Sequence, residues 1–212
     1  MTKEAPAPDW KGRTVVCLAS GPSLTQGDVD LVRRAGLPTI VTNTTFRMAP
    51  WADMLFGFDA RWWATKDPTT GLTHAQESAR DFAGRRITKS VLGTNHGIET
   101  LHGSSWFRGF GNSGTCAIAM AVHGGAARVL LLGFDCTFGP KGERHWHGNH
   151  PGGLGNCASI SRWPGHFKRT KRIADDAGVR VLNCTRRTAL DCFERVPLEQ
   201  AKRLADAVRD GD

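Results

Sequence analysis

The stretch "ARVLLLGFD", residues 127–135, carries the clearest structural signal in the sequence. Its apolar run is almost unbroken, which is typical of a strand in a parallel sheet that is covered on both faces. The run ends at Gly133 and Asp135, and an unpaired carboxylate would be costly in the core. We therefore expect Asp135 to lie at the end of the strand, beside a partner or a ligand.

Further strands and helices alternate on both sides of this run. Apolar, β-branched runs predict strands at residues 13–19, 38–43, 52–58, 86–93 and 179–184. Capped or amphipathic segments predict helices at residues 25–35, 112–125, 160–177 and 197–210, and the polar residues 67–80 predict a loop. The alternation indicates an α/β fold, a Rossmann-like parallel sheet with helices on both faces. We expect a flexible tail over residues 1–11 and a single domain over residues 12–212.

The composition is that of an ordinary globular domain. The chain has 212 residues, of which 40% are hydrophobic and 23% charged. No apolar run approaches the roughly 18 residues of a membrane span, and the polar start is unlike a signal peptide. Six scattered cysteines without a CxxC pair indicate reduced thiols. These features predict a soluble, cytoplasmic protein.

The net charge of +8 is concentrated in residues 162–187. Eight lysines and arginines there stand against two aspartates, for a local charge of +6. Such a patch suits a phosphate-bearing partner, either a nucleotide or a nucleic acid. A solvated helix face explains the same residues equally well.

Ligands of parallel sheets bind at the carboxyl ends of the strands. The candidate segments are residues 20–24, 43–46, 58–61, 133–138 and 183–187. In the first, the turn Ser20-Gly21-Pro22-Ser23 could hold a phosphate through backbone N–H groups near a helix start. It matches neither GxGxxG nor the Walker pattern. Asn112 and Ser113 open a small-residue helix, either as a simple cap or facing a nucleotide.

A second stretch, "RHWHGNHPGGLGN" at residues 144–156, contains three histidines. It resembles the HxHxDHxGG metal loop of the metallo-β-lactamase superfamily. However, Asn149 replaces the aspartate, His166 is the only later histidine, and the preceding pattern is α/β. We expect no obligatory metal, and keep His145, His147 and His150 as the alternative metal site.

His166 lies in "WPGHF" at the start of the basic helix. Histidine is suited to proton transfer near neutral pH, and a helix N-terminus favours its neutral form. His166 is therefore a candidate base, although a lone histidine is more commonly structural.

Five of these pieces occur in the order of a known family. They are the SGPSL turn, Asn43 after the second strand, Ser113-Gly114, Gly133-Phe134-Asp135 and Gly165-His166. Across residues 15–193 the sequence resembles the bacterial CMP-sialic-acid-dependent sialyltransferases. The same superfamily includes a related domain of unknown function, found in 6-hydroxymethylpterin diphosphokinases and flagellin-modifying glycosyltransferases.

The resemblance implies roles for these residues. A nucleotide donor would be held by the first turn, the second-strand asparagine, the helix start and the strand-end loop: Ser20, Gly21, Pro22, Ser23, Asn43, Asn112, Ser113, Gly114, Asp135 and Thr137. His166 would deprotonate the acceptor. The family's two phosphate-binding tyrosines have no counterpart, because the chain contains no tyrosine. Arg144, His145 and His147 are the candidates to neutralise the leaving phosphate instead.

These residues predict a nucleotide-dependent transferase of a bacterial or phage type, favouring a glycosyltransferase with a nucleotide-sugar donor. Two alternatives remain open. One is an ATP-dependent diphosphokinase that uses Mg²⁺ and a hydroxymethyl acceptor. The other is a non-catalytic nucleotide- or DNA-binding module that uses the basic residues within 162–187.

Overall fold

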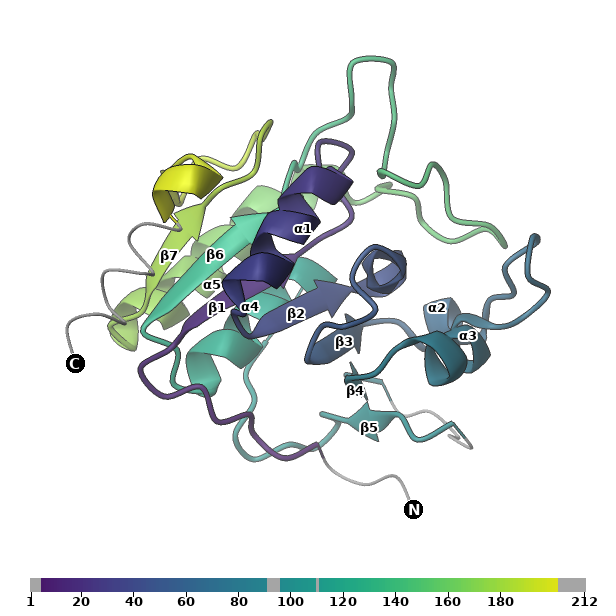
Figure 1. The fold of residues 1–212 in the computed structure, drawn as a ribbon, viewed down its shortest axis with the longest axis horizontal. Coiled ribbons are helices and arrows are strands. Elements are labelled where there is room, and N and C mark those ends of the chain that lie inside the picture. The colour runs from purple at the N-terminus through teal and green to yellow at the C-terminus, as the bar shows by residue number, and fades with distance from the viewer. Residues whose placement is uncertain (1–4, 91–95, 110, 202–212) are drawn as a thin grey trace.

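A computed structural model describes residues 5–90, 96–109 and 111–201. Eight strands form one parallel sheet in the order β5-β4-β3-β2-β1-β6-β7-β8 (Figure 1). The strands are β1 (Thr14–Leu18), β2 (Thr39–Thr42), β3 (Met54–Gly57), β4 (Arg85–Thr88), β5 (Glu99–Thr100), β6 (Arg128–Leu132), β7 (Arg180–Asn183) and β8 (Glu194–Arg195). The helices are α1 (Gln26–Ala35), α2 (Ala60–Ala64), α3 (His74–Asp81), α4 (Ser113–His123) and α5 (Trp163–Asp176), with 3-10 turns η1 (Asn43–Arg47) and η2 (Ile160–Arg162). The predicted α/β parallel sheet is confirmed.

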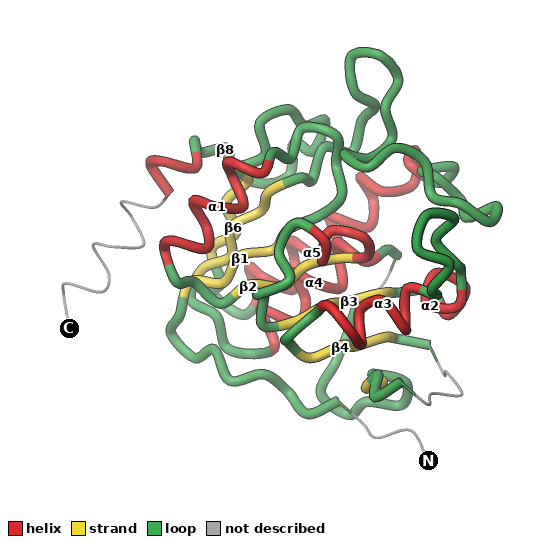
Figure 2. Tube along the Cα trace, turned by 45° about the vertical axis from the view of Figure 1, so that its right-hand side comes forward, coloured by secondary structure: helices red, strands yellow, loops and turns green. Residues whose placement is uncertain are grey.

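Both faces of the central strands are buried, as the apolar run predicted. Val15 and Cys17 of β1 face the cluster formed with α4 and α5. Val16 and Leu18 face the opposite cluster, which includes residues of α1, α2 and α3. Figures 1 and 2 show these helices on the two sides of the sheet. Because alternate residues of a strand point to opposite faces, every residue of such a strand must be apolar or hydrogen-bonded.

The order of the strands reverses beside β1. The chain runs outward from β1 through β2, β3 and β4 to β5, then returns through α4 to place β6 on the other side of β1. The β1–β6 pairing runs from Thr14 opposite Arg128 to Leu18 opposite Leu132. The turns after β1 and β6 therefore lie side by side at the switch point.

The helices predicted at residues 25–35 and 112–125 form as α1 and α4, each with a side-chain cap at its start. Thr25 and Asp28 form a capping box at the start of α1, and Gly36 ends the helix in the left-handed region. Asn112 and Thr115 form the equivalent box for α4. The N-cap of α4 thus lies at the pocket described below, and a local sequence signal positions it.

The prediction of a loop at residues 67–80 is wrong, because α3 occupies its second half. Thr73 and Gln76 form a capping box at the start of this helix. The helix contains no large apolar residue, and its buried face is formed by His74, Ala75, Glu77 and Ser78. Tertiary contacts stabilise it instead: Arg47 pairs with Glu77 at 2.6 Å, and the buried His74 ring stacks on Trp62 with centroids 4.5 Å apart.

Several expected segments extend to or beyond the described residues. The described part of the expected N-terminal tail lies against the domain: the Ala5 N–H donates to Thr100 O, and the Trp10 N–H to Gly124 O. The strand expected at 86–93 ends as β4 at Thr88, and residues 91–93 lie outside the described residues. The closing helix expected at 197–210 is helical over 198–201, and its remainder also lies outside them.

Within the described ranges, no helix combines the length and apolar character needed to cross a membrane. The six cysteines are all free thiols, as their scattered spacing predicted.

We predict that Gly133→Ala destabilises the fold. Gly133 has φ of +72°, and an added Cβ would overlap the backbone oxygen of Ala19. The loss should be at least about 2 kcal/mol, measured by urea denaturation. Gly27→Ala in α1 is the matched control, because the added Cβ would lie 3.7 Å from its nearest neighbour, the Thr25 hydroxyl oxygen. Equal stability of the two variants would contradict the steric argument.

Candidate functional site

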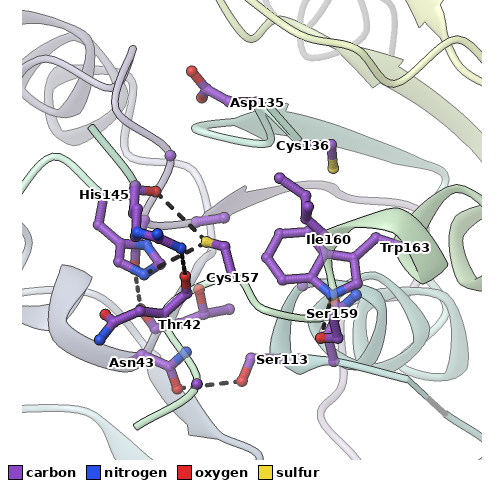
Figure 3. Close-up of a pocket in the computed structure, with 18 of the residues that line it drawn as sticks. Thr42, Asn43, Ser113, Asp135, Cys136, His145, Cys157, Ser159, Ile160 and Trp163 are labelled. Carbon is purple, nitrogen blue, oxygen red and sulfur yellow. Dashed lines mark hydrogen bonds between the residues drawn. The ribbon is translucent and has the colours of Figure 1, made fainter. Parts of the chain in front are cut away.

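A pocket of about 620 Å³ opens at the carboxyl ends of the strands, at the switch point. It is lined by the ends of β1, β2, β3 and β6, by the start of α4, and by the loop that leads to α5. In the view of Figure 3, Asn43 and Ser113 lie at one end, and Asp135 and Cys136 at the other. A site here is the general expectation for an open α/β sheet.

Asp135 binds the first turn to the end of β6. Its carboxylate accepts hydrogen bonds from the Ser23 N–H at 3.0 Å and from the Ser23 hydroxyl at 2.9 Å. The Gly21 N–H donates to Gly133 O at 2.8 Å, and a Cβ on Gly21 would overlap the Asp135 carboxylate. The partner expected for Asp135 is therefore Ser23, and Asp135 positions the turn that faces the pocket.

Burial raises the pKa of Asp135 to about 6, against the opposing effect of the Ser23 hydrogen bonds and the Arg187 charge. The side chain is only 2% exposed. The carboxyl group thus titrates close to neutral pH at the edge of the pocket.

The opposite wall presents amide and hydroxyl groups. The Ser113 hydroxyl donates to the Asn43 side-chain oxygen at 3.2 Å and accepts from the Phe58 N–H at 3.3 Å. Asn112 accepts from the Thr115 N–H at 3.0 Å, while its buried Nδ2 has no hydrogen-bond partner among the described residues. Asn43 has φ of +49°, a conformation that asparagine tolerates better than most residues. The N-terminus of α4 and the unpaired amide group of Asn112 therefore lie together at the cavity wall, an arrangement suited to an anionic ligand.

His166 lies beside the pocket in the first turn of α5. Its ring packs so closely on Gly111 that a Cβ at Gly111 would overlap it. Gly111 lines the pocket, and the buried Nδ1 of His166 has no partner among the described residues. His166 itself is not a lining residue.

The histidine loop is anchored from both ends. Between His145 and His147, the Trp146 N–H donates to Ser20 O at 3.1 Å and its indole N–H to the Thr45 hydroxyl at 3.3 Å. Farther along, the Asn156 side chain accepts from the His150 N–H at 2.6 Å and donates to His150 O at 3.0 Å. The three histidines are thus held by the site's own scaffold.

The three imidazoles converge. The His145 and His147 rings are stacked with centroids 5.1 Å apart, and the tilted His150 ring lies 4.6 Å from each. One ring nitrogen of each lies within 4.8 Å of the other two. His145 and His150 line the pocket, and His147 lies behind them.

Burial determines the charge of this cluster. It lowers the pKa of His145 to about 4, and those of His147 and His150 to about 3. At neutral pH the three imidazoles are uncharged, so positive charge on this loop comes from Arg144. Its guanidinium donates to Asn156 O at 2.6 Å and lies over the Phe138 ring.

The structure brings together most of the residues expected from the sequence. Twelve line the pocket: Ser20, Gly21, Pro22, Asn43, Asn112, Ser113, Gly114, Asp135, Thr137, Arg144, His145 and His150. Ser23, His147 and His166 are not lining residues, and contact those that are. The end of β7, also a candidate segment, borders a separate cavity with Asp28 and Arg186.

Sequence reasoning missed several lining residues. Thr42, Cys157, Ile160 and Trp163 line the cavity (Figure 3), and so does Trp62. Their residue types carry no motif. Thr42 and Trp62 belong to β2 and α2, whereas Cys157, Ile160 and Trp163 reach the pocket because the segment after β6 folds back across the strand ends. A left-handed backbone at Asn156 and Cys157 makes this fold-back.

The basic patch is largely exposed but partly neutralised. Lys171 pairs with Asp175, Arg180 with Glu194, and Arg186 with Asp28. Arg162 is exposed and lines the pocket, so the patch begins at the cavity's edge.

Comparison with known proteins finds a similar solved structure. No protein-family model and no curated protein matches the chain. Among solved structures, the MAf glycosyltransferase from Magnetospirillum magneticum AMB-1 is similar, with a TM-score of 0.59 and 12% sequence identity. The match covers 99% of this chain and 38% of that one. The chain has a glycosyltransferase-like fold. At this identity the likeness concerns the fold alone, over a little more than a third of the larger protein.

We predict that ionisation of Asp135 destabilises the folded state. Because its folded pKa of about 6 lies above the roughly 3.9 of an unfolded aspartate, the folded protein binds more protons between these values. The group's favourable contribution is present below about pH 4 and is lost as the pH rises through 6. Asp135→Asn removes this titration, so from pH 4 to 7 its stability should improve relative to wild type by as much as about 3 kcal/mol.

Urea denaturation at several pH values measures this difference. Asp176→Asn, on the exposed side of α5, is the control for loss of one carboxylate. Parallel pH profiles for wild type and Asp135→Asn would contradict the prediction.

Proposed function

We propose that the protein is a glycosyltransferase that uses a nucleotide-sugar donor and belongs to the sialyltransferase-like superfamily. The observation that carries this proposal is the pocket at the switch point, which joins the SGPS turn, Asn43 and the α4 N-terminus in one cavity. The glycosyltransferase-like fold supports it.

The donor nucleotide would lie between the first turn and α4. Backbone N–H groups at the start of an eleven-residue helix attract phosphate through their partial positive charge. The unpaired Asn112 Nδ2 adds a donor, and Asn43 and Ser113 present polar atoms beside it. Asp135 and Thr137 would border the donor from the β6 side, with Asp135 holding Ser20–Ser23 in place through Ser23.

His166 would act as the base. Its nitrogen accepts the proton of the acceptor hydroxyl, whose oxygen forms a bond to the anomeric carbon of the sugar. The bond from that carbon to the donor's phosphate oxygen breaks, and its electron pair leaves with the nucleotide. Arg144 would stabilise the charge that develops on this phosphate, while His145 and His147, being neutral, would act as hydrogen-bonding groups rather than as cations.

An anionic acceptor fits the pocket's edge. Arg162 lines the cavity, and the exposed Lys168 and Arg172 follow it on α5. We infer that the acceptor carries phosphate, as a nucleic acid does. Transfer to an oligonucleotide should then weaken steeply with salt, because bound counterions are released.

We predict that His166→Ala abolishes transfer and preserves donor binding. Loss of a general base typically lowers kcat by about 10²–10⁴-fold. Release of free nucleotide from a panel of nucleotide sugars would measure transfer, and thermal shift would measure binding. His102→Ala, at an exposed histidine remote from the pocket residues, is the matched control.

Unchanged turnover in His166→Ala would exclude His166 as the base. Mg²⁺-dependent release of AMP from ATP, with no nucleotide sugar consumed, would instead identify a diphosphokinase. Salt-sensitive DNA binding without turnover of any donor would identify a binding module.

A further inference from the structure

Besides the hydrogen bonding assigned to His145 and His147, the histidine cluster at the pocket wall offers a metal-binding chemistry that the proposed transfer does not require. Three ring nitrogens within 4.8 Å of one another come from a single loop of six residues, His145 to His150. Three imidazoles that converge on one point are a typical ligand set for zinc and related ions, and their neutral form is the one that binds.

The ring nitrogens themselves point to a missing partner. His147 Nε2 and His150 Nδ1 are buried, and neither has a hydrogen-bond partner among the described residues. A buried polar atom left unpaired costs about 1–3 kcal/mol. Two such atoms in one cluster, on rings that already face each other, are most simply satisfied by one shared ligand.

The three ring nitrogens are close enough to one another to share one ion. Around a tetrahedral zinc ion with Zn–N bonds of about 2.0–2.1 Å, the nitrogens lie roughly 3.3 Å apart. The three ring nitrogens lie within 4.8 Å of one another, and rotation about side-chain bonds is the motion that would adjust their separation to this value.

The surroundings hold the rings for binding. Trp146, which lies between the two stacked histidines in the sequence, donates hydrogen bonds to Ser20 and Thr45. The Asn156 side chain accepts a hydrogen bond from the His150 N–H and donates one to the His150 carbonyl. Such supporting contacts reduce the ordering that a metal must otherwise impose. The Cys157 thiol lies 3.7 Å from His145 Nε2, but is not within the group of converging ligand atoms.

We propose that His145, His147 and His150 bind one divalent transition-metal ion of the zinc class, with an open coordination position toward the pocket. Two of the three ligands line the cavity, so the open position faces the space where a phosphate oxygen or a water molecule can bind. The ion would add to the pocket the positive charge that the neutral imidazoles lack. Metal binding does not depend on the proposed glycosyl transfer, and only the contact to a donor phosphate rests on it.

The first test measures metal content without any substrate. The full chain, free of a histidine tag, is stripped with a chelator, reloaded with Zn²⁺ and analysed by mass spectrometry and calorimetry. We expect one ion per chain in wild type and in the control His102→Ala. His147→Ala and His150→Ala should each weaken binding by at least about 100-fold, since even supporting residues can cost 10–100-fold.

His147→Gln and His150→Gln provide variants of closer size, and circular dichroism checks that each remains folded. The proposal would be overturned if wild type bound fewer than one zinc ion per chain. It would also be overturned if the folded histidine variants bound zinc as tightly as wild type does.

The second test uses Co²⁺ as a spectroscopic substitute. A site of three nitrogens and one oxygen should give visible d–d bands without a thiolate charge-transfer band, and Cys157→Ser should leave both spectrum and stoichiometry unchanged. Loss of binding in Cys157→Ser would replace the three-histidine site with one that includes sulfur. Addition of inorganic pyrophosphate should shift the bands, and unchanged bands would overturn the open position.

Discussion

The pairing of β1 with β6 is the constraint on which the rest of the structure depends. Five consecutive residues of each strand are in register, and both faces of the pair are buried. A slip of one residue would exchange the two buried faces, so the register is strongly determined. It places the turn after β1 directly beside the turn after β6, where the Ser23 to Asp135 hydrogen bonds join them.

The pocket follows from this join. The connection after β1 leads to β2 on one side, and the connection after β6 leads to β7 on the other side. Because the two connections diverge at the carboxyl ends of β1 and β6, a cavity remains between them. The same turn supplies Ser20 O as the anchor for Trp146, so the histidine loop is built on the β1–β6 pair as well. The β1–β6 pair thus positions both the expected donor-binding turn and the histidine cluster.

The electrostatics of the pocket are unusual for a site expected to hold phosphate. Its buried carboxyl group titrates near pH 6, and its three histidines are neutral at pH 7. Fixed positive character comes from the α4 N-terminus, Arg144 and Arg162. A metal ion on the histidines would place the largest local charge on the wall that otherwise lacks one.

Local patterns in the sequence determined much of the fold: the apolar run of β6, the capping residues of α1 and α4, and the alternation that requires a parallel sheet. They also indicated the SGPS turn and Asn43 as residues at strand ends and Ser113 as a residue at a helix start, because burial and capping depend on near neighbours. The Thr73–Gln76 capping box was a local signal for α3, and the tertiary structure adds contacts from Arg47 and Trp62 that stabilise the helix from outside its own segment. Likewise, the pairing of Ser23 with Asp135 and the convergence of the three histidines depend on contacts with residues distant in the chain. Periodicity cannot encode such contacts, because the free energy that fixes them arises only after the strands have paired.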